Sequence, residues 1–548
     1  MKPIKILFLL LLIISGNLYS QNNGFIPEFN LIDINGINGF EIYGTNQFDS
    51  IGHSNASAGD LNGDGLDDMI IANTFVIFGD AAGFPNPLET SSLNGSNGFK
   101  IISTGGSTDV NTISDINGDG LDDIIIGSAF SSPNGITQAG VTYIVFGNNT
   151  GFTASLDLSN LNNENGFIIQ GNHLFGSSGI SVSSAGDLNA DGINDILIGA
   201  PGASRSGFLS EGSSYVIFGS DSGYPNPLDL ATLNGQNGFT IHGNLNFSRS
   251  GRSVSSAGDV NGDGIDDVII GAHATPSNGF SEVGKSYIIF GSKNDFPNPL
   301  LLTNLNGDNG FIINGDEERG MFGWSVDGAG DINADGVDDL IIGAYLATAE
   351  SVDESGLSYV LFGNKIGFPN EFNVSDLDGD NGFVIHGITR FQGVGYSVSS
   401  AGDVNVDGID DIIIGTNERF INNELIGSSF IIFGSKDNFA NPFELSNLDG
   451  QNGIIINGIS DSQRTGRDVN SVGDINGDGV GDVIIGSEFA SPNGNFPAGI
   501  SYVIFGSNTI GTGLIQSIPV QVRSPWMLFL LFISILTIFK FYSLSKNN

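Results

Sequence analysis

Residues 257–272 read AGDVNGDGIDDVIIGA, a cluster of aspartates and glycines followed at once by a run of branched apolar residues. The same pattern occurs seven times along the 548-residue chain, and most copies lie 72 residues apart. The first aspartates of the seven copies are Asp60, Asp115, Asp187, Asp259, Asp331, Asp403 and Asp474. Self-similarity at a fixed period is typical of a repeat architecture, in which each unit is one supersecondary structure.

Each repeat contains four short segments that are typical of β-strands. In the repeat that holds residues 257–272, they are residues 253–259, 267–272, 286–291 and 310–315. Four strands in each of seven repeats predict an all-β fold, a seven-bladed β-propeller with four-stranded antiparallel blades. The second and third segments contain the continuous apolar runs VIIG and YIIF, which suits inner strands that are covered on both faces.

The fourth strand of the repeat also predicts how the ring closes. One copy, GFEIYG at residues 39–44, precedes the first acidic cluster, whereas no copy follows the last third strand at residues 501–506. We therefore predict that the N-terminal strand completes the last blade. Such a closure joins the two ends of the ring and removes an open sheet edge.

The acidic cluster of each repeat has the spacing D-x-N-x-D-G-x-x-D, which is typical of a loop that wraps one cation. Calcium takes six to eight oxygen ligands, and such a loop presents them from alternate positions. In the fourth copy they are Asp259, Asn261, Asp263, the carbonyl of Ile265 and Asp267. Glycine at position six permits the sharp turn. We predict up to seven structural calcium ions.

The predicted calcium loops are called the acidic loops below and comprise residues 60–68, 115–123, 187–195, 259–267, 331–339, 403–411 and 474–482. In the other six loops the predicted ligands are Asp60, Asn62, Asp64, Leu66, Asp68, Asp115, Asn117, Asp119, Leu121, Asp123, Asp187, Asn189, Asp191, Ile193, Asp195, Asp331, Asn333, Asp335, Val337, Asp339, Asp403, Asn405, Asp407, Ile409, Asp411, Asp474, Asn476, Asp478, Val480 and Asp482. Asp266, at position eight, is expected to point away from the ion. Acidic β-turns without a metal are the alternative, because Asp, Asn and Gly favour turns. An EF-hand does not fit, since it needs Glu at position 12, where this chain has Ile270.

The composition and the two ends of the chain predict an exported protein. A net charge of −42 argues against nucleic acid as a partner and favours bound cations. The chain has no cysteine, so disulfides cannot stabilise it outside the cell. Residues 1–20 are typical of a secretory signal peptide, and residues 526–542 of a transmembrane or sorting helix that follows a linker at 511–525. We expect the propeller, residues 21–510, at the cell surface, tethered or sorted through the C-terminal segment, or else secreted.

Two short motifs add a family resemblance, FGWSV at residues 322–326 and GAP at residues 199–201. Together with the repeated strands and loops, they resemble the FG-GAP repeat family over residues 38–506. The best-known members of that family are the propellers of integrin alpha chains. The resemblance implies a propeller that binds its partners on the face opposite the acidic loops.

The loops sort onto two faces, because successive strands of a blade run antiparallel. The acidic loops lie on one face, and the loops from second to third strands and from blade to blade lie on the other. The loops of this second face vary most between repeats, and recognition usually resides in variable loops on a rigid scaffold. Every arginine of the propeller body falls in them. The candidate ligand residues are Arg205, Arg249, Arg252, Arg319, Trp324, Arg390, Arg419, Arg464 and Arg467.

These features predict a calcium-stabilised adhesion or ligand-binding module for a surface protein or an anionic glycan. The alternative for the arginines is that they neutralise nearby acids. We do not expect an enzyme, because the five histidines are scattered, no nucleophile motif accompanies them and cysteine is absent. A polysaccharide hydrolase or lyase on a propeller scaffold and a structural surface-coat protein are the remaining alternatives.

Overall fold

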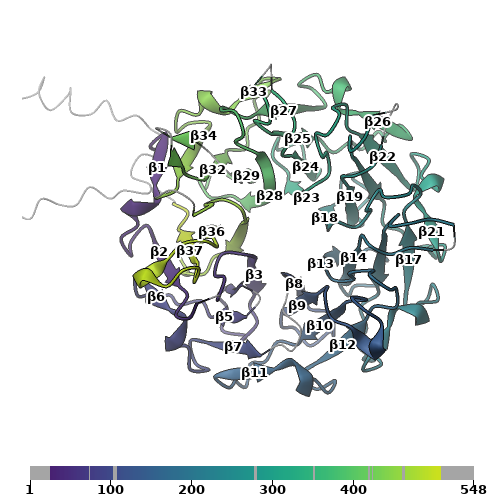
Figure 1. Ribbon diagram of the computed structural model, residues 1–548, viewed down its shortest axis with the longest axis horizontal. Helices are drawn as coiled ribbons and strands as arrows, with labels where there is room; N and C mark the ends of the chain where they lie inside the picture. Colours follow the sequence, from purple (N-terminus) through teal and green to yellow (C-terminus); the bar gives the residue numbers. More distant parts are fainter. Residues whose placement is uncertain are drawn as a thin grey trace, which may run out of the picture.

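The computed structural model describes residues 25–507 except for short gaps at 48, 73, 103–107, 206, 277–279, 350–351, 417–419, 422–423 and 460–462. Figure 1 shows seven sheets arranged radially around one axis, in the order of the chain. The prediction of an all-β, seven-bladed propeller is therefore confirmed. No helix within the described residues is long and apolar enough to cross a membrane. The signal peptide, the linker and the C-terminal helix predicted from the sequence lie outside the described residues.

The strands occupy equivalent places from blade to blade. The innermost strands are β3 (Asn55–Gly59), β8 (Asp109–Ser114), β13 (Ser181–Gly186), β18 (Ser253–Gly258), β23 (Val326–Gly330), β28 (Val394–Gly402) and β35 (Val469–Gly473). The second strands are β4 (Asp68–Ile71), β9 (Asp123–Ser128), β14 (Asp195–Ala200), β19 (Asp267–Ala272), β24 (Asp339–Ala344), β29 (Asp411–Thr416) and β36 (Asp482–Ser487). The third strands are β5 (Phe75–Ile77), β10 (Val141–Val145), β15 (Ser213–Ile217), β20 (Lys285–Ile289), β25 (Leu357–Leu361), β32 (Ser428–Ile432) and β37 (Ile500–Ile504).

The outer part of each blade contains two strands. The fourth strands are β7 (Gly98–Ile102), β12 (Gly166–Gln170), β17 (Gly238–His242), β22 (Gly310–Asn314), β27 (Gly382–His386), β34 (Gly453–Asn457) and β2 (Gly39–Tyr43). The fifth strands are β11 (Ser155–Asp157), β16 (Leu228–Asp229), β21 (Leu300–Leu301), β26 (Glu371–Asn373), β33 (Phe443–Glu444), β1 (Glu28–Asn30) and β6 (Leu88–Glu89). A small hairpin, β30 (Phe420–Ile421) with β31 (Glu424–Leu425), stands apart from the blades.

The short 3₁₀-helices lie in the connections. Those that follow the fifth strands are η1 (Leu31–Asp33), η2 (Thr90–Ser92), η4 (Leu158–Asn160), η5 (Leu230–Thr232), η6 (Leu302–Asn304), η7 (Val374–Asp376) and η8 (Leu445–Asn447). Those that lie between second and third strands are η3 (Pro133–Gly135) and η9 (Pro492–Gly494).

The fifth strand is an addition to the predicted four. It runs parallel to the fourth strand and belongs to the next repeat; β26, for example, leaves the fifth blade and pairs with β22 of the fourth, with Ile313 opposite Phe372. Each repeat thus contributes backbone hydrogen bonds to the blade before it. A strand of two or three residues is too short to produce an apolar period in the sequence.

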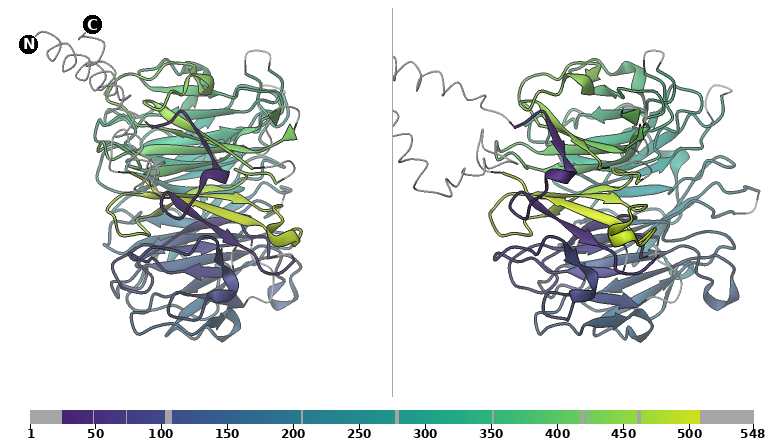
Figure 2. Two further views of the ribbon diagram at one scale, coloured as in Figure 1. Left: turned by 90° about the vertical axis from the view of Figure 1, so that its left-hand side faces the viewer. Right: turned by 60° about the vertical axis from the view of Figure 1, so that its left-hand side comes forward.

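The N-terminal segment completes two blades rather than one. β2 pairs antiparallel with β37 in the seventh blade, which confirms the predicted closure, and β1 pairs in parallel with β34 in the sixth. Figure 2 shows this N-terminal segment, in purple, against the green and yellow strands of those blades. The side chains of Phe29 and Phe40 are fully buried there. Closure therefore adds apolar packing as well as backbone pairing.

Paired glycines allow the inner strands of neighbouring blades to approach closely. Gly271 ends the apolar run of β19, and a Cβ added to it would overlap the carbonyl oxygen of Gly323 in the next blade. The same overlap would occur between Gly199 and Gly251 and at four further junctions. Small residues are needed where two backbones come into contact. This packing explains the glycine at the start of the GAP motif.

Candidate functional site

The seven acidic loops share one backbone conformation. In loop 259–267 the two carboxylate oxygens of Asp259 accept hydrogen bonds from the N–H groups of Asp263, at 2.9 Å, and Gly264, at 2.8 Å. The same two bonds recur in all seven loops. The first aspartate therefore holds each loop in a closed turn, as Asp side chains commonly do.

The ninth residue of each loop joins the loop to its blade. Asp267 is fully buried and accepts hydrogen bonds from the N–H groups of Gly291, at 2.9 Å, and Val260, at 3.1 Å. Burial, followed by the charges of Asp263 and Asp259, raises the pKa of Asp267 to about 8. A buried carboxyl beside two others is stable as an anion only with a positive charge nearby. The site thus has the electrostatic character of a cation site.

The loop chemistry fits calcium through a mixed set of oxygens. Within residues 25–507, gaps excepted, no three Asp, Glu or His side chains come together as a ready-made metal-binding group. An ion in loop 259–267 would therefore also need the amide oxygen of Asn261 and the carbonyl of Ile265, as the spacing predicts. The seven calcium sites remain a prediction.

The eighth position of the loop has a role that sequence reasoning missed. Asp338 points away from its own loop, as expected for this position, and accepts a hydrogen bond of 2.8 Å from the N–H of Asp259 in the preceding blade. Equivalent bonds occur at five junctions. A side chain on Gly258 would overlap the Asp338 carboxylate. In the sequence, the glycine that precedes the first aspartate of the loop, such as Gly258, was the feature that could have indicated this contact.

The opposite face carries the loops between second and third strands and the connections between blades, and it is called the connection face below. It concentrates large apolar side chains that are exposed to solvent. They are Phe130, Leu174, Phe175, Leu209, Leu245, Phe247, Phe280, Phe391 and Phe496. Their exposed fractions range from 38% for Leu245 to 61% for Leu209. A single exposed apolar residue is ordinary, whereas a group on one face marks an interaction surface.

The predicted arginines have different surroundings. Arg249 and Arg319 are exposed. Arg205 contacts Glu211 at 2.8 Å and Arg390 contacts Asp353 at 2.9 Å, so both neutralise local acids. Arg464 lies over the ring of Phe489 at 4.9 Å. Arg419 lies outside the described residues.

The remaining predicted residues, Arg252, Trp324 and Arg467, meet at the mouth of the central channel. The Arg252 guanidinium lies 4.5 Å from the centre of the Trp324 ring, and Trp324 packs against Tyr396 at 5.7 Å. The Arg467 guanidinium donates a hydrogen bond of 3.2 Å to the Tyr396 hydroxyl and pairs with Glu488. Arg252, Trp324, Tyr396 and Arg467 follow one another at intervals of about one repeat in the sequence, and the closed ring places them side by side.

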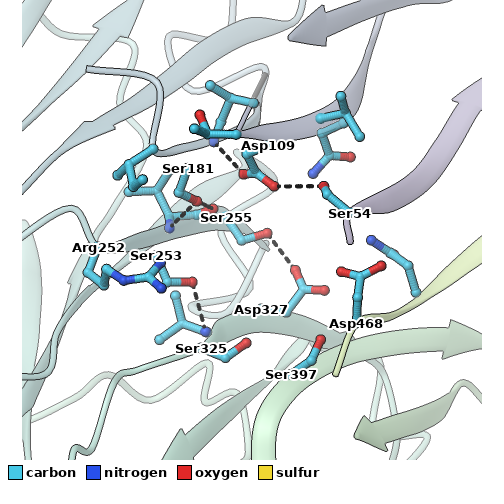
Figure 3. Close-up of a pocket in the computed structure, with 18 of the residues that line it drawn as sticks. Ser54, Asp109, Ser181, Arg252, Ser253, Ser255, Ser325, Asp327, Ser397 and Asp468 are labelled. Carbon is cyan, nitrogen blue, oxygen red and sulfur yellow. Dashed lines mark hydrogen bonds between the residues drawn. The ribbon is translucent and has the colours of Figure 1, made fainter. Parts of the chain in front are cut away.

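Below the mouth, polar side chains join each innermost strand to the next. The Ser253 hydroxyl accepts a hydrogen bond from the N–H of Val326 at 3.1 Å, and Asp468 accepts one from the N–H of Asn55 at 2.9 Å. Such bonds are present at six of the seven junctions. Figure 3 shows the serines and aspartates of this layer around the channel.

Replacing Asp468 by asparagine should flatten the dependence of stability on pH. Burial, and secondarily the charge of Asp109, raises the pKa of Asp468 to about 7, while the Asn55 hydrogen bonds and His53 lower it. The folded state therefore binds this proton more tightly than the unfolded chain, and stability falls as pH rises from about 4 to 7. Melting temperatures of both proteins between pH 5 and 8 test this. Parallel profiles would contradict it.

The FG-GAP repeat family model matches residues 108–145, 178–217, 250–289 and 322–361. These four units match the FG-GAP repeat. Each match covers the first three strands of one blade, from the second blade to the fifth. The sequence-based resemblance is thereby confirmed, and the acidic loop is part of every matched stretch.

Proteins similar to this chain include integrin alpha chains and phospholipases. Human phosphatidylinositol-glycan-specific phospholipase D is 28% identical over 295 residues, which are 54% of this chain and 32% of that protein. Integrin alpha pat-2 of Caenorhabditis elegans is 32% identical over 252 residues, 42% of this chain and 18% of that protein. Integrin alpha-4 of Xenopus laevis is 33% identical over 165 residues, which are 30% of this chain and 14% of that protein. The chain thus spans a third or less of these relatives.

The prediction that the chain is not an enzyme is contradicted by these relatives. Proteins named phosphatidylinositol-glycan-specific phospholipase D from human, cattle and Dictyostelium discoideum match at 28%, 30% and 25% identity. Scattered histidines and the lack of a nucleophile motif do not exclude an enzyme, because one scaffold supports different functions and the repeated strands and loops of a propeller contain no catalytic motif of their own.

Proposed function

We propose that this FG-GAP propeller is an exported, calcium-stabilised module that binds a partner protein through its connection face. The observation that carries the proposal is the gathering of exposed apolar residues and exposed arginines on that face. Phe247, 57% exposed, and the exposed Arg249 lie in one blade-to-blade connection. Apolar side chains supply contact area, and arginine supplies hydrogen bonds that favour an acidic partner.

Three further features support the proposal. The integrin alpha relatives favour a protein ligand. The acidic loops supply the oxygen donors of structural calcium on the other face, away from the partner. The signal-like N-terminus and apolar C-terminal segment favour display at a cell surface, tethered or sorted through residues 526–542. An anionic glycan would satisfy the same arginines and is the alternative partner.

The double variant Phe247→Ala/Arg249→Ala is expected to weaken partner binding by at least about tenfold, since central interface residues carry most of the binding energy. The matched control is Lys365→Ala/Ile366→Ala on the acidic-loop face. It removes one positive charge and one apolar side chain, that of Ile366, which is 97% exposed. The purified chain would be screened against immobilised surface proteins and an array of sulfated and carboxylated glycans. Equal loss in both variants, or loss in the control alone, would overturn the assignment of the face.

A second candidate function rests on the relatives named as a phospholipase. The chain would then act on a phosphatidylinositol-glycan substrate, either by itself or together with a separate enzyme. Incubating the purified chain with a glycosylphosphatidylinositol-anchored reporter on vesicles tests this. Release of the reporter supports the second function, and no release above a buffer control argues against it.

A further inference from the structure

The central channel contains a cavity of about 370 Å³ at the end that opens on the connection face. Its walls are the innermost strands of all seven blades, the residues just before them and Phe130. The volume is at the lower end of the range for small-molecule sites. Phe130 thus belongs both to the cavity and to the exposed apolar residues of the connection face, whereas Phe247 and Arg249 do not line the cavity.

Three carboxylates line this cavity without a basic partner. Figure 3 shows the side chains of Asp109, Asp327 and Asp468 pointing into the same space from three different blades. Their hydrogen bonds come from neutral donors, such as the N–H of Val182 to Asp109 at 2.9 Å and the side-chain amide of Asn55 to Asp468 at 2.7 Å. Among the described residues, none of the three forms an ion pair. The cavity therefore attracts a positive charge.

One guanidinium faces the same cavity and is also unpaired. The Arg252 guanidinium lies over the Trp324 ring, and the described part of the chain offers it no hydrogen bond or ion pair. Burial lowers the pKa of Arg252, and the charges of Tyr396 and Asp109 oppose that shift. Arg467 holds the equivalent mouth position in another blade and is satisfied by Glu488 and Tyr396. The contrast identifies Arg252 as the mouth arginine available to a ligand.

We propose that the channel is a binding site for a small zwitterion, an α-amino acid with a free ammonium and a free carboxylate. The carboxylate pairs with Arg252 at the mouth, where a planar guanidinium can bind it with two hydrogen bonds. The ammonium extends inward and donates hydrogen bonds to the channel carboxylates. Binding thereby compensates charges of both signs that the protein itself leaves unpaired in a partly desolvated space.

Two alternatives are less consistent with this cavity. A divalent cation would compensate the channel carboxylates but would leave the Arg252 guanidinium without a counter-charge. A simple anion would be repelled by the three carboxylates, which outnumber Arg252. A ligand with a carboxylate at one end and an ammonium at the other compensates both Arg252 at the mouth and the carboxylates farther inside.

The test is calorimetric titration of the purified chain with each of the twenty free L-amino acids at pH 8. At least one is expected to bind with a Kd below about 10 mM. Its N-acetyl derivative and its amide, which lack the ammonium and the carboxylate respectively, are expected to bind at least about tenfold more weakly. Absence of saturable binding by all twenty, or binding of both derivatives as tightly as the parent, would overturn the proposal.

The variant Arg252→Gln is expected to reduce the affinity at least about tenfold, because one charge-assisted pair is lost. Lys365→Gln is the control, since it removes one positive charge from an exposed side chain on the acidic-loop face, away from the cavity, and should leave the affinity within about twofold. Asp109→Asn should weaken binding in the same way as Arg252→Gln, and melting curves confirm that each variant is folded. Equal affinities of wild type and the folded Arg252→Gln would refute the site. Because Arg252→Gln leaves Phe247 and Arg249 in place, failure of this proposal and failure of the protein-binding proposal are distinguishable.

Discussion

Replacing Phe40 by alanine should lower the free energy of unfolding by about 3–5 kcal/mol, the usual cost of truncating a buried phenylalanine. Phe40 lies in β2, is fully buried, and stacks on Phe84 at 4.3 Å. The loss is large compared with the total stability of about 5–15 kcal/mol of typical proteins. The substitution weakens the packing where β2 closes the ring against β37. Urea denaturation, followed by tryptophan fluorescence and circular dichroism, measures the change in the free energy of unfolding.

The matched control is Ile37→Ala, a truncation three residues earlier in the same segment at a side chain that is 69% exposed. It should change the free energy of unfolding by less than about 0.5 kcal/mol. Removal of the whole segment up to residue 44 takes away β1 and β2 together and is expected to prevent folding. A truncated chain as stable as the intact one would show that the ring does not depend on this closure.

Removing calcium should lower the melting temperature by at least about 10 °C, because seven sites would lose their ligand together. With extracellular affinities of about 10⁻⁴ to 10⁻³ M, each filled loop contributes about 1–3 kcal/mol at 10 mM calcium. Without the ion, buried carboxyls such as Asp267 must remain protonated or bear an uncompensated charge. Differential scanning calorimetry in 10 mM calcium and in excess EDTA measures the difference.

A single-loop variant separates the ion from the loop's own hydrogen bonds. Asp263→Asn keeps an oxygen that can accept the 3.0 Å hydrogen bond from the N–H of Ile265 but removes one charge of the predicted site. It should bind one calcium fewer by calorimetric titration and keep most of the calcium-dependent rise in melting temperature. Identical melting curves of the wild type in calcium and EDTA would refute structural calcium.

The repeat period carried most of the fold prediction. Seven acidic clusters, the apolar runs after them and the unmatched strand at residues 39–44 predicted the blade number and the closure, because these signals are local and recur. The fifth strands escaped notice because two or three residues, such as Leu228–Asp229, leave no period. The candidate ligand residues stay a prediction. Arg205 and Arg390 pair with acids, and their partners were visible in the sequence only as nearby acidic residues.

The sequence by itself determined the propeller, its number of blades and the two kinds of loop, since alternating turn and strand chemistry is encoded within each repeat. Only the tertiary structure decided which residues of different repeats meet. Arg252 and Arg467 have the same place in their repeats, yet Arg467 finds Glu488 and Tyr396 whereas Arg252 is left facing the channel. Glu488 follows β36 in the blade of Arg467 itself, whereas Tyr396 comes from β28 of the preceding blade. Side chains about 72 residues apart become adjacent only when the blades close around one axis.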